Sequence, residues 1–388
     1  MPDFPPRRVA FTYISRKQWA GGYNYQRNLF AALARYCPGR IAPVLFAAEA
    51  SDELAAFSTI PGVEVTVSPT FGRSIGLMDA LTSGIDHAAT NAFVLKNIEL
   101  VFENARFFGW RLPFPALAWF PDFQHIRLPQ LFSRRARLRR DLGFRVQIAS
   151  GRSILLSSET ALRDYRATYA GRSNSVFVAR FAVEPPRDLL TDDISPILSR
   201  YGLPQKFFYL PNQFWRHKNH QTVVDALTIL TERGVQVTIA ASGSAEDPRE
   251  PGHFEDIMDQ VRDRGLGSYF HYLGMIPLAH VYALLRVTMA LINPSLFEGW
   301  SSTVEEAKSF GIPLILSDID VHREQAGAGA RFFGVDDASA LAGHLSEVWS
   351  KPAPARPRNL VLSHEQRVAD FANDIVSAVE RSIDHRTV

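Results

Sequence analysis

The sequence predicts an α/β protein made of two Rossmann-like, doubly wound parallel-sheet domains that face a cleft. Apolar runs of strand length alternate with amphipathic stretches of helix length, which is typical of repeated βα units in a parallel sheet. The alternation stops once, where prolines and charges gather in residues 183–193, and then starts again. A length of 388 residues also suits two or three domains of ordinary size.

The first half of the chain contains an alternating series of expected strands and helices. The strands are expected at residues 8–15, 43–47, 63–67, 116–120, 154–157 and 175–178. The clearest helices are expected at residues 24–36, 91–108 and 158–169. Gly21 and Gly22 should form the turn before the first of these helices, because glycine adopts backbone conformations that other residues avoid.

The second half repeats the pattern after the proline-rich pause. Strands are expected at residues 206–210, 235–240, 269–273, 288–292 and 313–316. Helices are expected at residues 219–233, 253–264, 278–285 and 302–310, with a last helix at 364–383. We therefore expect an N-terminal domain at 1–187, a C-terminal domain at 188–363, and a terminal segment, 364–388, that packs back on the N-terminal domain.

Composition excludes several classes of protein. The chain has 42 basic and 40 acidic residues, a balance that argues against a general nucleic-acid binder. The single cysteine, Cys37, can form neither an internal disulfide nor a cysteine-rich zinc site. We find no signal peptide and no apolar stretch of about 18 residues, so the expected location is the cytoplasm.

Ligands of open parallel sheets bind beyond the carboxyl ends of the strands. That rule selects the residues that directly follow the expected strands. They are Gly21–Gly22, Asp122–His125, Asn212–Lys218, Ser242–Gly243 and Glu298–Ser302.

The strongest motif is PSLFEGWSSTVEEAKSFGIP, which starts at Pro294. Ser302 is a good helix N-cap, and Glu305 three residues later would complete a capping box. The start of such a helix attracts anions, by roughly 0.3–2 kcal/mol for each interaction. Glu298 and Glu306 could therefore bracket a phosphate-linked sugar, or they could be two solvent-facing glutamates beside a capped helix.

This segment resembles the donor-binding stretch of glycosyltransferase family 4 (group 1), the retaining enzymes of the GT-B fold, of the type that builds bacterial surface polysaccharide. The matching positions are Glu298–Gly299, Glu306–Ala307, Gly311 and Pro313. The resemblance implies that Glu298 contacts the transferred sugar and Glu306 the ribose. It also implies that the loop residues between them line the donor site, namely Gly299, Trp300, Ser301 and Ser302.

A second matching segment is LPNQFWRHKNHQTVVDAL, from Leu210. Lys218 matches a family lysine that would stabilise the diphosphate leaving group as its charge grows. Gln213 stands where the family commonly has arginine, and Arg216 is a candidate replacement. The alternative is a basic helix start, with Asn219 as N-cap, that has no role in catalysis.

Other donor and acceptor positions follow from the same resemblance. Gly21 and Gly22 match the family's glycine loop, or they form an ordinary tight turn. The donor base is expected against the backbone of Gly274, Met275 and Ile276, and Ser242–Gly243 stands where the family has a glycine.

The segment Pro-Asp-Phe-Gln-His supplies Asp122 and His125, which resemble residues that orient the acceptor hydroxyl or line the sugar pocket. A histidine of near-neutral pKa can also act as a base. The alternative is a turn aspartate and a structural histidine.

Two further patterns have an ordinary interpretation beside a functional one. Asp318 and Asp320 form the Asp-x-Asp pattern of metal-dependent transferases. They follow the last donor motif, however, and no cluster of further metal-ligating residues stands nearby in sequence, so no metal site is predicted. An arginine cluster could be a solvated helix face, or it could dock on anionic lipid at about 1 kcal/mol per residue, which would suit a lipid-linked acceptor. The cluster consists of Arg134, Arg135, Arg137, Arg139 and Arg140.

The resemblance implies an enzyme that moves a hexose or deoxyhexose from a nucleoside-diphosphate sugar, held by the C-terminal domain, to a saccharide acceptor held by the N-terminal domain. The donor is a co-substrate, and no cofactor or metal is expected. One alternative is a non-catalytic sugar-nucleotide-binding or scaffold protein on the same fold, which the departure at Gln213 leaves open. An NAD-dependent oxidoreductase is the other, but its first turn would need G-x-G-x-x-G where this chain has AGGYNY.

Overall fold

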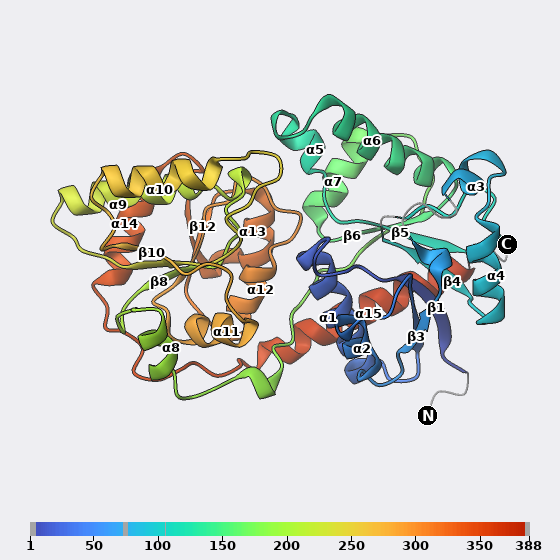
Figure 1. Ribbon diagram of the computed structural model, residues 1–388, viewed down its shortest axis with the longest axis horizontal. Helices are drawn as coiled ribbons and strands as arrows, with labels where there is room; N and C mark the ends of the chain where they lie inside the picture. Colours follow the sequence, from blue (N-terminus) through green and yellow to red (C-terminus); the bar gives the residue numbers. More distant parts are fainter. Residues whose placement is uncertain (1–4, 73–76, 105, 385–388) are drawn as a thin grey trace. The chain divides into compact units, whose positions relative to one another are not determined.

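The computed structural model describes residues 5–72, 77–104 and 106–384, and the chain divides into two compact units (Figure 1). Unit 1 consists of the described residues up to Ile126, of Ser133–Glu184 and of the described residues from Glu365 onward. Unit 2 consists of Arg127–Phe132 and Pro185–His364. The sequence prediction had placed the boundaries after residues 187 and 363 and had left 127–132 in the first domain.

Unit 1 is built on a parallel sheet with the strand order β3-β2-β1-β4-β5-β6-β7. Its strands are β1 (Arg7–Thr12), β2 (Ile41–Ala47), β3 (Glu64–Val67), β4 (Leu100–Glu103), β5 (Ala116–Phe120), β6 (Ser153–Leu156) and β7 (Val176–Val178). Its α-helices are α1 (Ala20–Tyr36), α2 (Asp52–Ser58), α3 (Leu77–Thr82), α4 (His87–Leu95), α5 (Gln124–Arg127), α6 (Arg134–Ala149), α7 (Glu159–Thr168) and α15 (Ser363–Asp384), of which α5 and α15 each cross a unit boundary by one or two residues.

Strand β4 contradicts the prediction of one helix over residues 91–108. Helix α4 ends at Leu95, and Asn97 then adopts a positive φ of 51° that turns the chain into the strand. All four residues of β4 are buried, and the strand pairs with β1 on one side and β5 on the other. A short strand buried on both faces shows no polar alternation, so its pattern cannot be told from that of a buried helix.

The glycine pair also differs from the prediction, because Gly21 and Gly22 lie in the first turn of α1 and not in a loop. The indole of Trp19 packs over them, and a Cβ on Gly22 would lie 2.3 Å from Trp19 Cε3. Trp19 in turn stacks on Trp119, with ring centroids 5.4 Å apart. The absence of a side chain at Gly22 therefore makes room for an aromatic stack.

Unit 2 contains a second parallel sheet, with the order β10-β9-β8-β11-β12-β13. Its strands are β8 (Phe208–Leu210), β9 (Ile239–Ala241), β10 (Phe270–Tyr272), β11 (Leu291–Asn293), β12 (Leu314–Ser317) and β13 (Ala330–Phe333). Its α-helices are α8 (Ser195–Arg200), α9 (His220–Glu232), α10 (His253–Asp263), α11 (Leu278–Val287), α12 (Ser302–Ser309), α13 (Asp320–Ala326) and α14 (Ala338–Trp349).

Helices cover both faces of the unit 2 sheet, so its strands are apolar on both sides. Phe208 packs in the core that α9 and α14 share, whereas the adjacent Tyr209 packs in the opposite core with α11 and α12. The two parallel α/β domains confirm the predicted fold class. Within the described residues, no helix has both the length and the apolar character that crossing a bilayer would need.

Candidate functional site

The carboxyl edge of the unit 2 sheet brings together loops that are distant in sequence. The loop after β8 carries Lys218, and the loop after β11 carries Glu298. The Lys218 Nζ lies 2.6 Å from Glu298 Oε1, and both side chains are largely buried. A buried ammonium–carboxylate pair thus stands where the open-sheet rule expects a ligand.

Glu298 is held in place by its neighbours. Ser295 Oγ donates a hydrogen bond to its Oε1 at 2.8 Å, and the Asn293 amide lies 3.5 Å from the same oxygen. Burial raises the pKa of Glu298, but the charge of Lys218, followed by that of His322, outweighs burial and brings the pKa down to about 2. The carboxyl group is therefore ionised at neutral pH.

The start of α12 corrects the predicted capping box. The N-cap is Ser301 rather than Ser302, and its Oγ accepts from Asn293 Nδ2 at 2.9 Å instead of capping the helix. Glu305 turns away from the cap and accepts hydrogen bonds from Lys308 Nζ at 2.8 Å and Gln325 Nε2 at 3.0 Å. The competing ion pair and the amide from α13 explain why the box does not form.

Gln325 also fixes the loop that precedes α12. Its Nε2 donates to the Ser301 carbonyl at 2.8 Å, and its Oε1 accepts from the Ser301 N–H at 3.2 Å. No local pattern pointed to Gln325, which comes 24 residues later in sequence. Asn293 and Ser295 were also missed, although both lie at or just beyond the end of β11, where the open-sheet rule would have selected them.

Glu306 lies one residue further along α12 and has a different environment. Its side chain is only 8% exposed, and its carboxyl group makes no hydrogen bond or ion pair with any residue that the structure describes. Burial raises the pKa of Glu306 to about 8. A buried carboxyl group without a partner costs stability, and such groups concentrate at functional sites.

Two glycine-containing segments meet at the same sheet edge. The Gly243 N–H donates to the Gly274 carbonyl at 3.0 Å, and the Tyr272 hydroxyl donates to the Gly243 carbonyl at 3.0 Å. Gly243 has a φ of 152°, and a Cβ there would lie 2.5 Å from the Asn212 carbonyl oxygen.

The other expected donor-site residues lie nearby in sequence. Ser242 directly follows β9, and its Oγ lies 2.6 Å from the buried Tyr209 hydroxyl. Of the other expected base-binding residues, Met275 is exposed and Ile276 packs partly against the core.

The loop around Lys218 differs from the prediction in two details. Asn219 occupies the N-cap of α9, but its side chain donates to the carbonyls of Pro294 and Val335, at 3.2 and 2.8 Å, instead of capping the helix.

Arg216, the candidate second cation, is 58% exposed and pairs with Glu250 at 3.1 Å. No described contact joins Arg216 to the Lys218–Glu298 pair. Gln213 contributes its carbonyl to the loop, where it accepts from the Trp215 N–H.

The acceptor-side candidates lie in unit 1, after β5. Asp122 Oδ1 accepts from the Gln124 N–H at 2.8 Å, which is a local turn, and from Arg140 at 2.9 Å. His125 is 2% exposed, neither ring nitrogen has a hydrogen-bond partner among the described residues, and its ring lies 5.5 Å from that of Phe144. Burial, followed by the charge of Arg140, lowers the pKa of His125 to about 4, so the ring is neutral.

The Asp-x-Asp pattern after β12 is engaged elsewhere. Asp318 binds Arg323, whose Nη2 lies 2.6 Å from Asp318 Oδ2. Within the described ranges, no group of three or more His, Cys, Asp or Glu side chains is arranged to hold a metal ion.

Comparison with known proteins agrees with this geometry. The family model described as "Glycosyl transferases group 1" matches residues 199–361, which include the Lys218–Glu298 pair and Glu306. The O-antigen chain mannosyltransferase B of Escherichia coli is 26% identical over 172 residues, or 42% of this chain. That match spans 43% of the relative's length.

Solved structures share the whole fold. The sucrose-phosphate synthase of Thermosynechococcus elongatus aligns with a TM-score of 0.65 at 17% identity, over 98% of both chains. Anabaena Alr3699/HepE, solved in complex with UDP and glucose, aligns with a TM-score of 0.64 at 16% identity, also over 98% of both chains. The two-domain fold is the GT-B fold, and residues 199–361 form a region that matches the group 1 glycosyltransferase family model.

Proposed function

We propose that this protein is a retaining glycosyltransferase that moves a hexose or deoxyhexose from a nucleoside-diphosphate sugar to a saccharide acceptor. The observation that carries the proposal is the buried Lys218–Glu298 pair, which stands at the carboxyl edge of the unit 2 sheet beside the helix that bears Glu306. Cation, carboxylate and helix start together suit a sugar attached to a diphosphate.

Each group has a distinct role in the proposed reaction. Lys218 stabilises the charge that grows on the diphosphate as its oxygen leaves the anomeric carbon. Glu298 accepts hydrogen bonds from hydroxyls of the transferred sugar, and Glu306 accepts them from the ribose. The acceptor oxygen bonds to the anomeric carbon on the face that the leaving group departs, and its proton passes to the leaving phosphate oxygen. This scheme uses no protein nucleophile and needs neither a metal nor another cofactor.

The remaining expected site residues keep supporting roles in the proposal. Gly274 has open space where a side chain would stand, which leaves room for the nucleotide, whereas Gly243 packs closely against the Asn212 carbonyl. We assign acceptor binding to Asp122 and the neutral His125 of unit 1, and a donor-binding role to Gly21–Gly22 at the start of α1. Arg216 has the weakest support, because Glu250 already pairs with it.

The proposed acceptor belongs to surface-polysaccharide assembly. The name of the E. coli relative, an O-antigen chain mannosyltransferase, supports this class of acceptor, and the UDP and glucose bound to the Anabaena protein support a nucleotide-sugar donor. We propose that the acceptor is lipid-linked and is met at the cytoplasmic face of a membrane.

Helix α6 supplies the proposed membrane contact. Its N-terminal half carries exposed basic residues, and no acidic residue occupies its first turn. Positive charge at a helix N-terminus is unfavourable, because it lies beside the positive end of the helix dipole. An anion that binds there from outside would reduce this electrostatic repulsion. Leu138 and Leu142 lie one turn apart and are 68% and 56% exposed, which adds an apolar strip to the cationic face. The exposed arginines are Arg134, Arg135, Arg137 and Arg139, while Arg140 binds Asp122.

Removing this charge should release the protein from anionic vesicles. We expect the wild type to sediment with vesicles of phosphatidylcholine and phosphatidylglycerol, and the variant with all four exposed arginines changed to Gln to bind at least about a hundredfold more weakly. Arg262→Gln, which removes an exposed arginine of α10, is the matched control and should bind like the wild type. Equal binding by the wild type and the fourfold variant would refute the membrane contact.

A ligand panel tests the proposed function directly. Thermal stability is measured with UDP, GDP, dTDP, ADP and NAD, with and without magnesium, and donor hydrolysis or transfer is then assayed with the nucleotide that binds. We expect a rise in melting temperature with one nucleoside diphosphate, independent of magnesium. A rise with NAD alone would favour an oxidoreductase, and donor binding without hydrolysis or transfer to any acceptor would favour a non-catalytic protein on this fold.

A further inference from the structure

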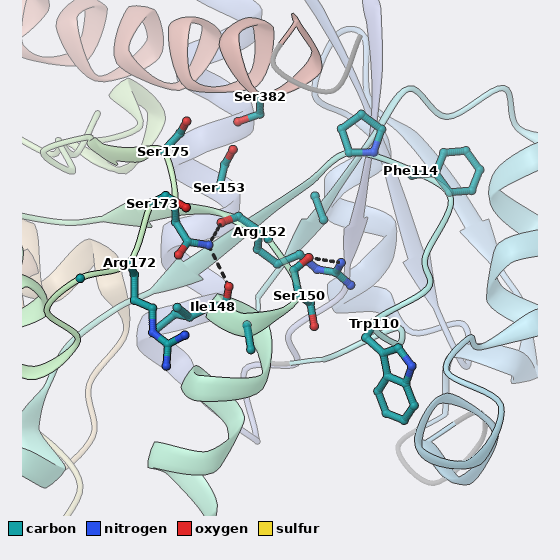
Figure 2. Close-up of a pocket in the computed structure, with 16 residues that line it drawn as sticks. Trp110, Phe114, Ile148, Ser150, Arg152, Ser153, Arg172, Ser173, Ser175 and Ser382 are labelled. Atoms are coloured by element: carbon teal, nitrogen blue, oxygen red, sulfur yellow. Dashed lines mark hydrogen bonds between the residues drawn. The ribbon is translucent and has the colours of Figure 1, made fainter. Parts of the chain in front are cut away.

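Unit 1 contains a pocket of about 550 Å³ (Figure 2). The strand bounds put this pocket at the sheet edge opposite to the one where Asp122 and His125 follow β5. Pro115, Ser153 and Ser175 line it, and these residues stand at the beginnings of β5, β6 and β7. Asp122 and His125 follow the end of β5. Because the strands are parallel, the pocket is separated from these residues by the length of the strands. Its volume lies within the range of about 300–1,000 Å³ that small-molecule sites occupy.

Hydroxyl groups dominate the polar wall. Ser150, Ser153, Ser173 and Ser175 line it from two separate segments, residues 148–153 and 171–175, and Ser382 adds a fifth hydroxyl from α15. The hydroxyls of Ser153, Ser173 and Ser175 make no hydrogen bond with any described residue, so they are available to a ligand.

The backbone around these hydroxyls is held firmly. Asn174 Nδ2 donates to the carbonyls of Ile148 and Arg152, at 2.9 and 2.8 Å, which fastens the loop before β7 to the end of α6 (Figure 2). The guanidinium of Arg152 is buried and already paired with Glu103 at 3.1 Å. The wall is therefore pre-formed, and the charge of Arg152 is neutralised.

An aromatic side chain stands at one end of the pocket. Trp110 is 47% exposed, and its Nε1 would lie 2.6 Å from a Cβ at Gly84, so part of the indole rests directly on that glycine. Figure 2 shows Trp110 and Arg172 at opposite ends, with Ser150 between them. An indole braced on one side and open on the other can stack on an apolar face of a ligand.

The walls discriminate between classes of ligand. An anion such as phosphate would need concentrated positive charge, but Arg172 is the one lining cation without an ion pair among the described residues. The carboxyl end of α6 also borders the pocket, and its dipole repels anions. A sugar has hydroxyls that both donate and accept hydrogen bonds and an apolar ring face that stacks on indole. Both features match this wall.

We propose that this pocket is a second glycan-binding site, which holds a distal part of the acceptor chain while the growing end is extended elsewhere. The pocket's chemistry stands on its own, but its assignment to the acceptor rests on the proposed function. A chain held at a distance from the reacting end would raise the effective concentration of that end. Long acceptors should therefore gain more from the pocket than short ones.

Ligand-observed NMR with defined oligosaccharides tests the site, because it detects weak binding. The probes are mannohexaose, maltohexaose and cellohexaose, and inorganic phosphate is the competitor. Trp110→Ala should weaken binding about fivefold to tenfold, as loss of aromatic stacking predicts, and Trp110→Phe should recover most of it. Ser173→Trp should fill the pocket and abolish binding. Leu95→Ala, an exposed apolar residue of unit 1 that does not line the pocket, is the matched control.

The outcomes separate this site from the proposed transferase activity. Oligosaccharide binding that Ser173→Trp abolishes supports the pocket whether or not the protein transfers sugar. Three results would overturn it: the wild type binds none of the three probes, the pocket variants bind like the wild type, or phosphate displaces the sugars, which would make this an anion site. If transfer to long acceptors slows in Trp110→Ala while transfer to a monosaccharide acceptor is unchanged, the link to the acceptor chain is established. Equal slowing for both acceptors would refute that link.

Discussion

Replacing Glu306 by Gln should make the protein more stable and a poorer binder of its donor at the same time. The wild-type carboxyl group is buried, has no described partner and has a pKa of about 8. The amide avoids the cost of keeping that group protonated, so the variant should be about 1–3 kcal/mol more stable at pH 7. Loss of hydrogen bonds from the ribose to a carboxylate should weaken donor binding by roughly 10–100-fold. Urea unfolding and calorimetric titration measure the two effects.

The pH dependence has a definite sign. The pKa of Glu306 is raised in the folded protein, so the folded state holds a proton that the unfolded state releases above about pH 4.5. Wild-type stability should therefore fall as pH rises from about 4.5 to 8, and Glu306→Gln should remove this part of the slope. Hydrogen bonds from ribose favour the ionised form, so wild-type donor affinity should rise toward pH 8 and level off above it.

Glu305 is the matched control for stability, since it neighbours Glu306 and is also buried. Its carboxylate is bonded to Lys308 and Gln325, so Glu305→Gln breaks an ion pair and should destabilise the protein. A Glu306→Gln variant that loses stability and binds donor normally would show that Glu306 has only a structural role.

Lys218 should have the largest effect on turnover. Lys218→Met removes the cation proposed to stabilise the leaving diphosphate, and kcat should fall by about 10²–10³-fold. The same change leaves the Glu298 carboxylate buried without its partner, which should cost about 3–5 kcal/mol of stability. A fall in the activity of this variant alone would therefore not distinguish lost catalysis from lost stability.

The double variant Lys218→Met/Glu298→Gln separates the two effects. It removes both charges and replaces them with neutral groups of similar size, so most of the lost stability should return. Activity should stay as low as in Lys218→Met. Recovery of activity together with stability would show that the pair only supports the fold.

Acid should also weaken this pair in the wild type. The folded pKa of Glu298 is lowered to about 2, so its stabilisation is complete above about pH 4.5 and is lost as pH falls toward 2. The double variant should lack this acid-sensitive part of the unfolding free energy.

The amino-acid sequence determined the class of the fold and most of its elements, because the alternation of apolar runs and amphipathic stretches reflects local periodicity. Strand 116–120 was predicted with the bounds that the structure has, and the segments that carry Lys218, Glu298 and Glu306 were selected before any geometry was known. Local patterns could not distinguish the fully buried β4 from a helix, nor could they show that Gly22 makes room for Trp19.

Only the tertiary structure decided which groups meet. The Lys218–Glu298 pair joins residues 80 positions apart, and Gln325 reaches back 24 positions to hold Ser301. The sequence assigned Glu305 to a capping box and Glu306 to the donor site, but it did not show what surrounds either side chain. The fold surrounds one with Lys308 and Gln325 and buries the other without a partner. Pairing and burial depend on what distant elements bring to a position, and that is why chemically identical neighbours acquire different partners and different roles.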